Sequence, residues 1–459
     1  MKFHRAIALA MTLYALGACA ATKLAPGDVR VLPYYSLDPP TWPDSHRVVG
    51  FAQAIADAPD GRPVKLLTIH GMVASKSDFS DEWQANIAKP LGLVADTTRT
   101  SVDMFRGYEA QLVFGPAPVG ETTPQMTSRL TRTVWREPAN GEPKLIVYAL
   151  LWAPIRDDLK YRFFACFESR SEPTDRGHSE KPWTCPETPA ARNTGSRAVI
   201  NGGLKDSLMV RGFADAVIVN GALGDILRDD LALATCVMAF DTVANQKSLA
   251  AAPKMALQTS TMDRYKTQRC KPEELDKDVG LLSSGGNLEY FVLTHSLGSY
   301  YFLESQMRAH FLDPDDQLSN IQFQMFDRAT VFMFANQISL LSLANLRSYC
   351  MPHPVQGTSN PACPNFRLQP VESWKPNGGG AMTDYVAFND PDDILGFELP
   401  PHLADVNLGR YINVTVQNPA FTVPFLFRDP GGVHTSQQNN PAIIDALVNG
   451  ITVKKPPGS

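Results

Sequence analysis

The sequence predicts an α/β fold, and three kinds of segment support this prediction. In residues 291–299 an apolar, strand-like run leads into a tight turn with a serine at its apex, and residues 300–308 have the pattern of a helix. Residues 64–69 form a second apolar strand that ends in His-Gly. Two later strands, 384–389 and 410–417, each run into a polar loop. Strands that alternate with helices in this way are typical of α/β proteins.

The other elements follow from turn signals and periodicity. Residues 46–55 and 64–69 are predicted as strands on either side of an Asp-Gly turn. Residues 129–136 and 144–152 are predicted as the strands of a hairpin, because an Asn-Gly pair lies between them. A helix over residues 441–451 closes the fold.

Two regions interrupt this pattern and are interpreted together as an insertion over residues 155–285. Residues 155–197 are polar and rich in proline, whereas residues 207–240 have a helical pattern broken by glycines. We expect an excursion followed by helices that cover the sheet, with a cap over the site as one arrangement. A later loop, 349–380, contains a further cysteine pair.

Ser296 stands at the turn between the strand and the helix that follows it. A sharp strand–turn–helix raises the serine hydroxyl above the backbone and directs the positive end of the helix toward it. Such a turn needs small residues two positions before and after the serine. Gly298 meets this need, whereas Thr294 stands where glycine is usual. The alternative is a buried strand that runs into a helix and carries an incidental serine.

A nucleophilic serine needs a base and a carboxylate that orients it. Three aspartates follow the strand at 384–389, and we favour Asp393 because Ile-Leu follows it after a short turn containing proline. Asp390 is the alternative acid, being nearer to the end of the strand. His434, in a Gly-rich loop predicted over 430–436, is the candidate base because it follows the last strand.

Ser296, Asp393 and His434 appear in this order, each after its own strand. With the upstream His70-Gly71, this chain resembles the α/β-hydrolase superfamily, within its esterase and lipase-like branch. The resemblance implies an α/β-hydrolase fold over residues 46–459, with a mostly parallel central sheet flanked by helices.

The resemblance also implies an activity. The backbone N–H groups of Met72 and Leu297 would hold the oxyanion, and a small-molecule or lipid ester would be cleaved through an acyl-enzyme without a cofactor or metal. An acyltransferase or a peptidase would use the same triad. A catalytically silent lipoprotein that uses the fold for binding is the third alternative.

The N-terminus predicts export and lipidation. A basic start and a short apolar run precede Leu-Gly-Ala and Cys19, which resembles a bacterial lipobox. We expect residues 1–18 to be a signal peptide, Cys19 to be the lipidated residue and residues 19–45 to be a tether. The implied location is the cell envelope, at the outer membrane facing the periplasm. An ordinary secretory signal is the alternative.

Cysteine usage agrees with export. Lipidation of one of the seven cysteines leaves six, and an even number suggests disulfides in an exported protein. Metal binding is not expected, because no Cys-x-x-Cys spacing occurs. The expected short-range pairs are Cys166–Cys185, Cys236–Cys270 and Cys350–Cys363.

Composition excludes several classes of protein. Of the 459 residues, 44% are hydrophobic and 19% are charged, which suits a chain with a large core. The net charge of −5 becomes −7 without the signal peptide, with 40 basic residues against 47 acidic ones. No basic run occurs, so nucleic acid is not an expected partner. No transmembrane helix is expected after the signal peptide, and the oligomeric state is left open.

Overall fold

The computed structural model describes about half of the chain. The described residues are 29–32, 44–58, 62–72, 78–96, 99–104, 128–153, 212–249, 270, 290–311, 317–326, 329–342, 383–400, 403, 409–419, 422–423 and 427–455. In these parts of the chain, no helix combines the length and the apolar character that crossing a bilayer would need.

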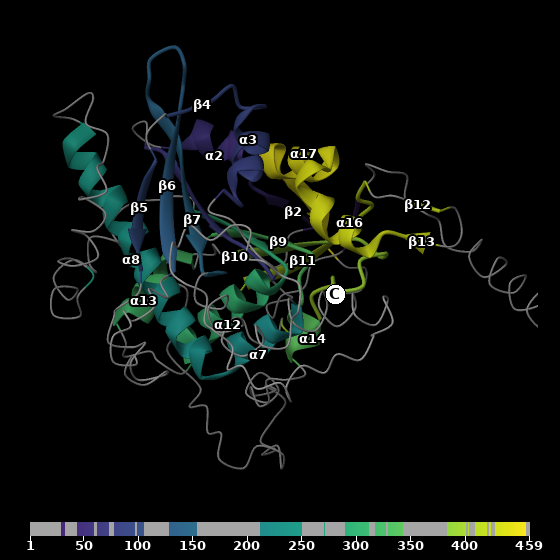
Figure 1. Cartoon of the computed structure of the whole chain (residues 1–459). Helices are drawn as coiled ribbons and strands as arrows, with labels where there is room; N and C mark the ends of the chain where they lie inside the picture. The colour runs from purple at the N-terminus through teal and green to yellow at the C-terminus, as the bar shows by residue number, and fades with distance from the viewer. Residues whose placement is uncertain are drawn as a thin grey trace, which may run out of the picture.

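A ten-stranded sheet forms the centre of the molecule (Figure 1). Its strands follow the order β1-β11-β10-β9-β8-β3-β7-β6-β4, and β5 pairs with β6 outside this path. The strands are β1 (Val29–Val31), β3 (Val64–Ile69), β4 (Val94–Ala95), β5 (Thr100–Asp103), β6 (Arg129–Arg136), β7 (Pro143–Leu151), β8 (Tyr290–His295), β9 (Thr330–Phe334), β10 (Thr383–Asn389) and β11 (Gly409–Val416).

The central strands are parallel. β7, β3, β8, β9, β10 and β11 pair in parallel, whereas β6 and its neighbours at one edge and β1 at the other are antiparallel. The antiparallel pairing of β6 with β7 confirms the predicted hairpin. A mostly parallel sheet needs helical crossovers, and helices flank this one on both faces. The predicted α/β class is therefore confirmed.

The helices lie in two layers (Figure 1). α2, α3 and α17 cover one face of the sheet, and α7, α8, α12 and α13 cover the other. The helices are α2 (Phe51–Asp57), α3 (Asp81–Ala88), α7 (Ala214–Asn220), α8 (Ala222–Leu249), α12 (Leu297–Phe311), α13 (Gln317–Phe326), α14 (Ile338–Ser342), α16 (Pro430–Thr435), the 3-10 helix η7 (Ser436–Asn439) and α17 (Pro441–Asn449).

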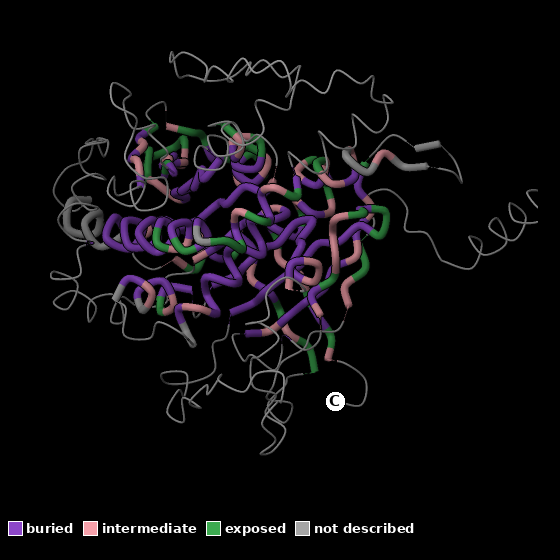
Figure 2. Tube along the Cα trace, turned by 60° about the horizontal axis from the view of Figure 1, so that its bottom comes forward, coloured by how far each residue is buried: buried purple, intermediate pink, exposed green. Residues whose placement is uncertain are grey.

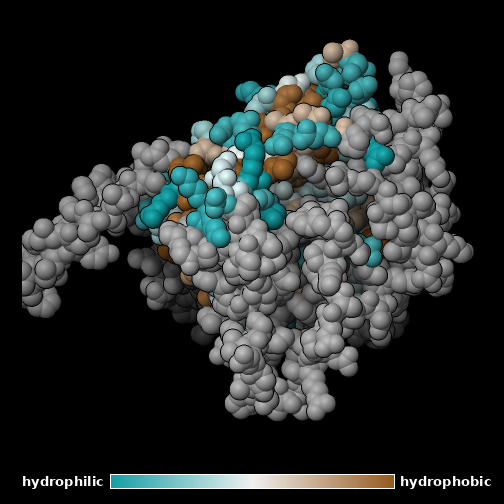
Figure 3. Space-filling view, turned by 180° about the vertical axis from the view of Figure 1, so that it is seen from behind, coloured by the Kyte–Doolittle hydropathy of each residue, from teal (hydrophilic) through white to brown (hydrophobic). Residues whose placement is uncertain are grey.

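Each face of the sheet has its own hydrophobic core, because alternate residues of a strand point to opposite faces. Leu66 contributes to the core under α2, α3 and α17, whereas Leu67 contributes to the core under α8, α12 and α13. The buried trace runs through the sheet and along the inner helices in Figure 2. Seen from behind, the described surface carries hydrophilic side chains interspersed with hydrophobic ones (Figure 3).

Two predictions near the N-terminus are wrong in part. Residues 46–55 do not form one strand: β2 (Ser45–Val48) pairs with β14 (Ile451–Lys454), and α2 begins at Phe51. The alanine-rich α2 buries Phe51 and Ala54 on one face, which is the three-residue spacing of a helix. Within the predicted tether, Val29–Val31 pairs with β11 as an edge strand.

Residues 212–249 of the predicted insertion are largely helical, as expected. α7 and α8 lie within 207–249, and α8 contacts β7, α12 and α13 on one face of the sheet. The sulfur atoms of Cys236 and Cys270 are 2.16 Å apart, within bonding distance. The other four expected disulfide cysteines, residues 1–18, Cys19 and residues 155–197 lie outside the described residues.

A charged cluster is buried between the sheet and α8. Lys65 Nζ donates a hydrogen bond of 3.0 Å to the hydroxyl of Tyr148 and lies 3.7 Å from Asp241 Oδ2. Arg132 Nε donates to the same carboxylate oxygen at 2.7 Å, and Tyr148 also bonds to it. Burial lowers the pKa of Lys65 from 10.5 to about 8, because the loss of hydration outweighs the attraction of Asp241.

Candidate active site

Ser296 occupies the turn between β8 and α12 in a backbone conformation that is rare for a residue with a side chain. Its φ is +54°, in the left-handed region. The turn is fixed from the neighbouring strand, because the Ser296 N–H donates to the carbonyl of Phe334 at 2.7 Å. Strain held by surrounding structure is characteristic of functional turns. The strand, the turn and the helix predicted around this serine are all present.

Two glycines allow the backbones to approach closely at this turn. A Cβ on Gly71 would lie 2.6 Å from Ser296 Cβ, and one on Gly298 would lie 2.6 Å from the carbonyl oxygen of His70. Both are distances that real Cβ atoms do not reach. Thr294 fits at the position where glycine is usual: its Oγ1 lies 2.8 Å from the hydroxyl oxygen of Ser299 on the helix. The hydroxyl pair bridges β8 and α12 at the turn.

His434 lies against Ser296 although 138 positions separate the two residues. His434 Nε2 is 3.0 Å from Ser296 Oγ, and His434 Nδ1 is 3.0 Å from each carboxylate oxygen of Asp393. The structure therefore brings together the three residues selected from the sequence. The prediction of a loop at His434 is wrong, because His434 lies in the short helix α16. The Pro-Gly-Gly that starts this helix has the appearance of a turn in the sequence.

The two candidate acids have different partners. The Asp393 side chain is buried beside His434, and its Oδ1 accepts the N–H of Leu395 at 3.0 Å. Burial pushes the pKa of Asp393 upward, but the hydrogen bond and charge of His434 outweigh it, so the pKa is lowered. Asp390 Oδ2 instead accepts the backbone N–H of Asn418 at 2.6 Å, which ties the end of β10 to the end of β11.

The two predicted oxyanion donors flank the turn. Leu297 is the first residue of α12, so its N–H is among those without a partner inside the helix. Met72 follows Gly71, which approaches Ser296 as described above.

His70 fixes the peptide that carries the Met72 amide. Its Nε2 accepts the N–H groups of Trp152 and Ala153 at 3.0 and 3.1 Å, which leaves Nδ1 to donate to the Gly71 carbonyl at 2.8 Å. In a trans peptide the N–H points opposite to the carbonyl, so the Met72 N–H points away from His70. His70 therefore supports the segment that carries the Met72 amide.

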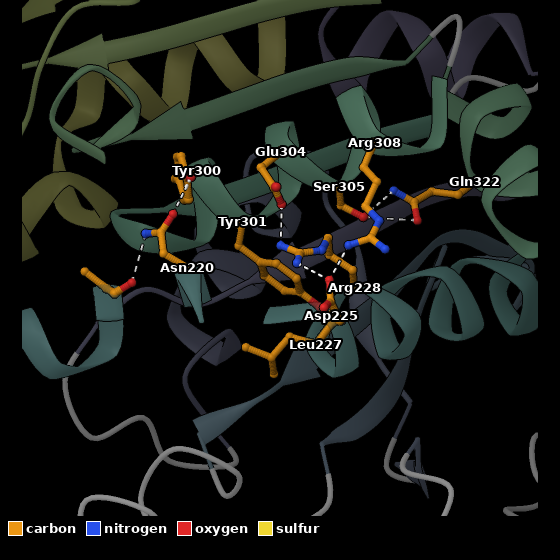
Figure 4. Close-up of polar contacts among 11 residues, drawn as sticks. Asn220, Asp225, Leu227, Arg228, Tyr300, Tyr301, Glu304, Ser305, Arg308 and Gln322 are labelled. Atoms are coloured by element: carbon orange, nitrogen blue, oxygen red, sulfur yellow. Dashed lines mark hydrogen bonds and ion pairs between the residues drawn. The ribbon is translucent and has the colours of Figure 1, made fainter. Parts of the chain in front are cut away.

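The helix α12, which follows the serine, is held to its neighbours α7, α8 and α13 by polar side chains (Figure 4). Arg228 of α8 donates to Glu304 at 2.6 Å and to Asp225 at 2.5 Å, and the Tyr301 hydroxyl bonds to the carbonyl of Leu227. Other pairs between labelled residues in this view are Tyr300–Asn220, Arg308–Asp225 and Ser305–Gln322. The Ser305–Gln322 pair joins α12 to α13, and the other contacts fix α12 relative to the described part of the insertion.

One residue of the site was not identified from the sequence. His295, directly before the serine, places its Nε2 2.9 Å from the backbone carbonyl oxygen of His434. No local sequence pattern predicts this contact, because its acceptor is a main-chain atom 139 positions away.

The aligned side chains can perform nucleophilic chemistry. A serine hydroxyl that hydrogen-bonds to an imidazole can lose its proton to that ring, and the carboxylate on the other side of the ring stabilises the resulting imidazolium. Among the described residues, no group of three His, Cys, Asp or Glu is arranged to hold a metal ion. Comparison of the chain with models of protein families, with curated proteins and with solved structures gives no match.

Proposed function

We propose that this protein is a serine hydrolase of the α/β-hydrolase type that cleaves carboxylic esters through an acyl-enzyme. One observation carries the proposal: Ser296, at a turn with φ of +54°, lies 3.0 Å from an imidazole whose other nitrogen faces a buried carboxylate. A strained serine, a base in reach and an orienting acid are the parts of a catalytic triad.

The order of the strands supports the same proposal. Ser296 and Asp393 follow β8 and β10, and His434 lies beyond β11 and the short strands β12 (Thr422–Val423) and β13 (Phe427–Arg428). β8, β10 and β11 are neighbours or near neighbours in the parallel part of the sheet. Parallel strands end at the same edge of a sheet, so the loops that follow them meet there. The antiparallel β6 on the far side of β7 is compatible with an α/β-hydrolase sheet that carries an antiparallel strand near one edge.

The first half of the proposed reaction acylates the enzyme. His434 Nε2 takes the proton of Ser296 Oγ as the oxygen attacks the ester carbonyl, and Asp393 stabilises the imidazolium through Nδ1–H. The N–H groups of Leu297 and Met72 stabilise the tetrahedral oxyanion, and losing one such donor typically costs about 100- to 1,000-fold in rate. His434 then gives the proton to the departing alkoxide.

The second half returns the free enzyme. A water molecule gives a proton to His434 and attacks the acyl carbonyl, and the same two N–H groups hold the second oxyanion. His434 then returns the proton to Ser296 Oγ as the carboxylic acid leaves. An acceptor alcohol in place of water would give acyl transfer from the same intermediate.

The proposal predicts hydrolysis of p-nitrophenyl esters by the protein lacking residues 1–19. Esters from acetate to palmitate would be compared by release of p-nitrophenol, for the wild type and for Ser296→Ala and His434→Ala. We expect both substitutions to lower kcat by several orders of magnitude, because the nucleophile or its base is removed. The preference for chain length would separate an esterase from a lipase.

Other outcomes of this experiment have defined meanings. Activity that survives in Ser296→Ala would overturn the assignment of the nucleophile. A folded wild type that cleaves no ester, but reacts with a fluorophosphonate at Ser296, would favour a transferase or peptidase. A folded wild type that fails in both assays would favour a binding protein that has lost catalysis.

We further propose that Cys19 is lipidated and anchors the protein to the cell envelope. The support is the sequence before Cys19, which combines a basic start, an apolar run and small residues. Intact-mass analysis of protein purified from membranes of a bacterial host is expected to show an acylated N-terminal cysteine. Cys19→Ser should abolish the added mass and move the protein to the soluble fraction. An unmodified N-terminus beyond Cys19 would contradict the anchor.

A further inference from the structure

His295 connects the residue before the nucleophile to the residue that carries the base. It is the last residue of β8, and its ring contacts the ring of His434 edge to face, with centroids 5.0 Å apart and an angle of 68° between the planes. The ring is also close to Gly71, where a Cβ would lie 3.0 Å from His295 Nδ1. The side chain therefore lies where three segments of the site meet.

The contact with His434 defines which nitrogen of His295 carries a proton. A carbonyl oxygen only accepts hydrogen bonds, so Nε2 at 2.9 Å from the His434 carbonyl carries hydrogen and donates. His434 lies in the last turn of α16, where carbonyls have no partner four residues on within the helix. His295 thus holds the main chain of His434 from outside the helix.

The ring of His295 is neutral while it does this. Burial lowers the pKa of His295 from 6.5 to about 4, and the nearby His434 adds to the effect, against the smaller opposing influence of the His434 carbonyl and Asp393. At neutral pH the ring is a hydrogen-bond donor without charge. A positively charged ring at His295, 5.0 Å from the ring of His434 between centroids, would destabilise the imidazolium that forms on His434 during the reaction.

We propose that His295 is a positioning residue, which sets the distance between Ser296 and His434 by holding the backbone of the base with a neutral donor. The inference rests on the hydrolase proposed above. Two consecutive residues, His295 and Ser296, contact the main chain and the ring of one residue, His434, at 2.9 and 3.0 Å. The two contacts fix both ends of that side chain relative to the end of β8.

Three substitutions at His295 distinguish the loss of the hydrogen-bond donor from the loss of the volume of the ring. His295→Gln places an amide N–H where Nε2 stood, His295→Asn carries the same amide on a chain too short to reach, and His295→Leu removes the donor. We expect Asn and Leu to lower kcat for p-nitrophenyl ester hydrolysis by about 10- to 100-fold, the scale of a small misplacement of reacting groups. KM should stay within about twofold, because the contact does not involve substrate. Gln should keep kcat within about threefold of wild type.

The rate of inactivation by a fluorophosphonate gives an independent measurement, because it reports how well His434 activates Ser296. The inactivation rate should fall in His295→Asn and His295→Leu in parallel with kcat, and it should be close to that of the wild type in His295→Gln. Wild-type kcat in the Asn variant, or an equal loss in Gln and Asn, would overturn the positioning role. If Leu fails to fold, the matched Gln and Asn pair still decides. A wild type in which Ser296 does not react with the reagent would instead contradict the hydrolase proposal.

Discussion

At the scale of single residues, Thr294 shows how the turn accommodates a departure from the usual glycine. A side chain two residues before the serine lies where the strand and the helix pass closely. Here the hydroxyl of Thr294 meets that of Ser299 at 2.8 Å, so the extra atoms gain a partner on the helix. Gly298 has no such freedom, since a Cβ there would meet the His70 carbonyl. The motif thus accommodates a side chain at Thr294 but not at Gly298.

The two candidate acids give a prediction at the same scale. Asp393→Asn should lower kcat by about a thousand- to ten-thousand-fold, because an amide would hold His434 in the wrong tautomer. Asp390→Asn should leave kcat within a few-fold and lower the free energy of unfolding by about 1–3 kcal/mol, because it weakens the bond to the Asn418 N–H. Ester hydrolysis and urea denaturation measure the two effects. The reverse pattern would show that Asp390 is the acid.

At the scale of elements, the buried cluster joins α8 to β3, β6 and β7. Lys65, Arg132 and Asp241 contribute two positive charges and one negative charge to an interior site. Removing one partner of a buried ion pair is costly when it leaves a buried charge uncompensated. Loss of Asp241 takes the counter-charge from both cations, whereas loss of Lys65 leaves Arg132 paired with Asp241. The cluster therefore makes the docking of α8 depend more on Asp241 than on Lys65.

This difference can be measured in two variants. Asp241→Asn should lower the free energy of unfolding by about 3–5 kcal/mol, because two buried cations lose their counter-charge. Lys65→Met should not lower it at pH 7, since the site already disfavours the charged lysine, by up to about 3 kcal/mol.

The effect of pH provides the control for these variants. Between pH 8 and 10.5 the unfolded chain binds more protons at Lys65 than the folded chain, so the stability of the wild type gains from this group as pH rises. Any advantage of Lys65→Met should therefore shrink toward pH 10. A loss of stability in Lys65→Met as large as that in Asp241→Asn would contradict this account.

For the molecule as a whole, the sequence predicted those features that depend on residues close together in the chain. The residues of the triad were identified because each follows its own strand in a fixed order, and Asp393 was preferred from its immediate neighbours. β9 was missed because a run of four apolar residues after Thr330 fits a short strand or a buried helix equally well. The placement of α2 and α16 failed because short helices depend on tertiary packing more than on propensity. The contact of His295 could not be predicted, since it joins distant segments through a main-chain atom.

The edge strand β1 bears on the lipid anchor proposed above. Its first residue, Val29, follows Cys19 by ten positions, and ten residues of fully extended chain span at most about 33–36 Å. A lipid on Cys19 would thus be joined by a short segment to β1, which pairs with β11 at the edge of the sheet. If both proposals hold, the anchored hydrolase would remain close to the membrane surface. It would draw substrate from the bilayer face and the thin water layer above it, rather than from the bulk of the compartment.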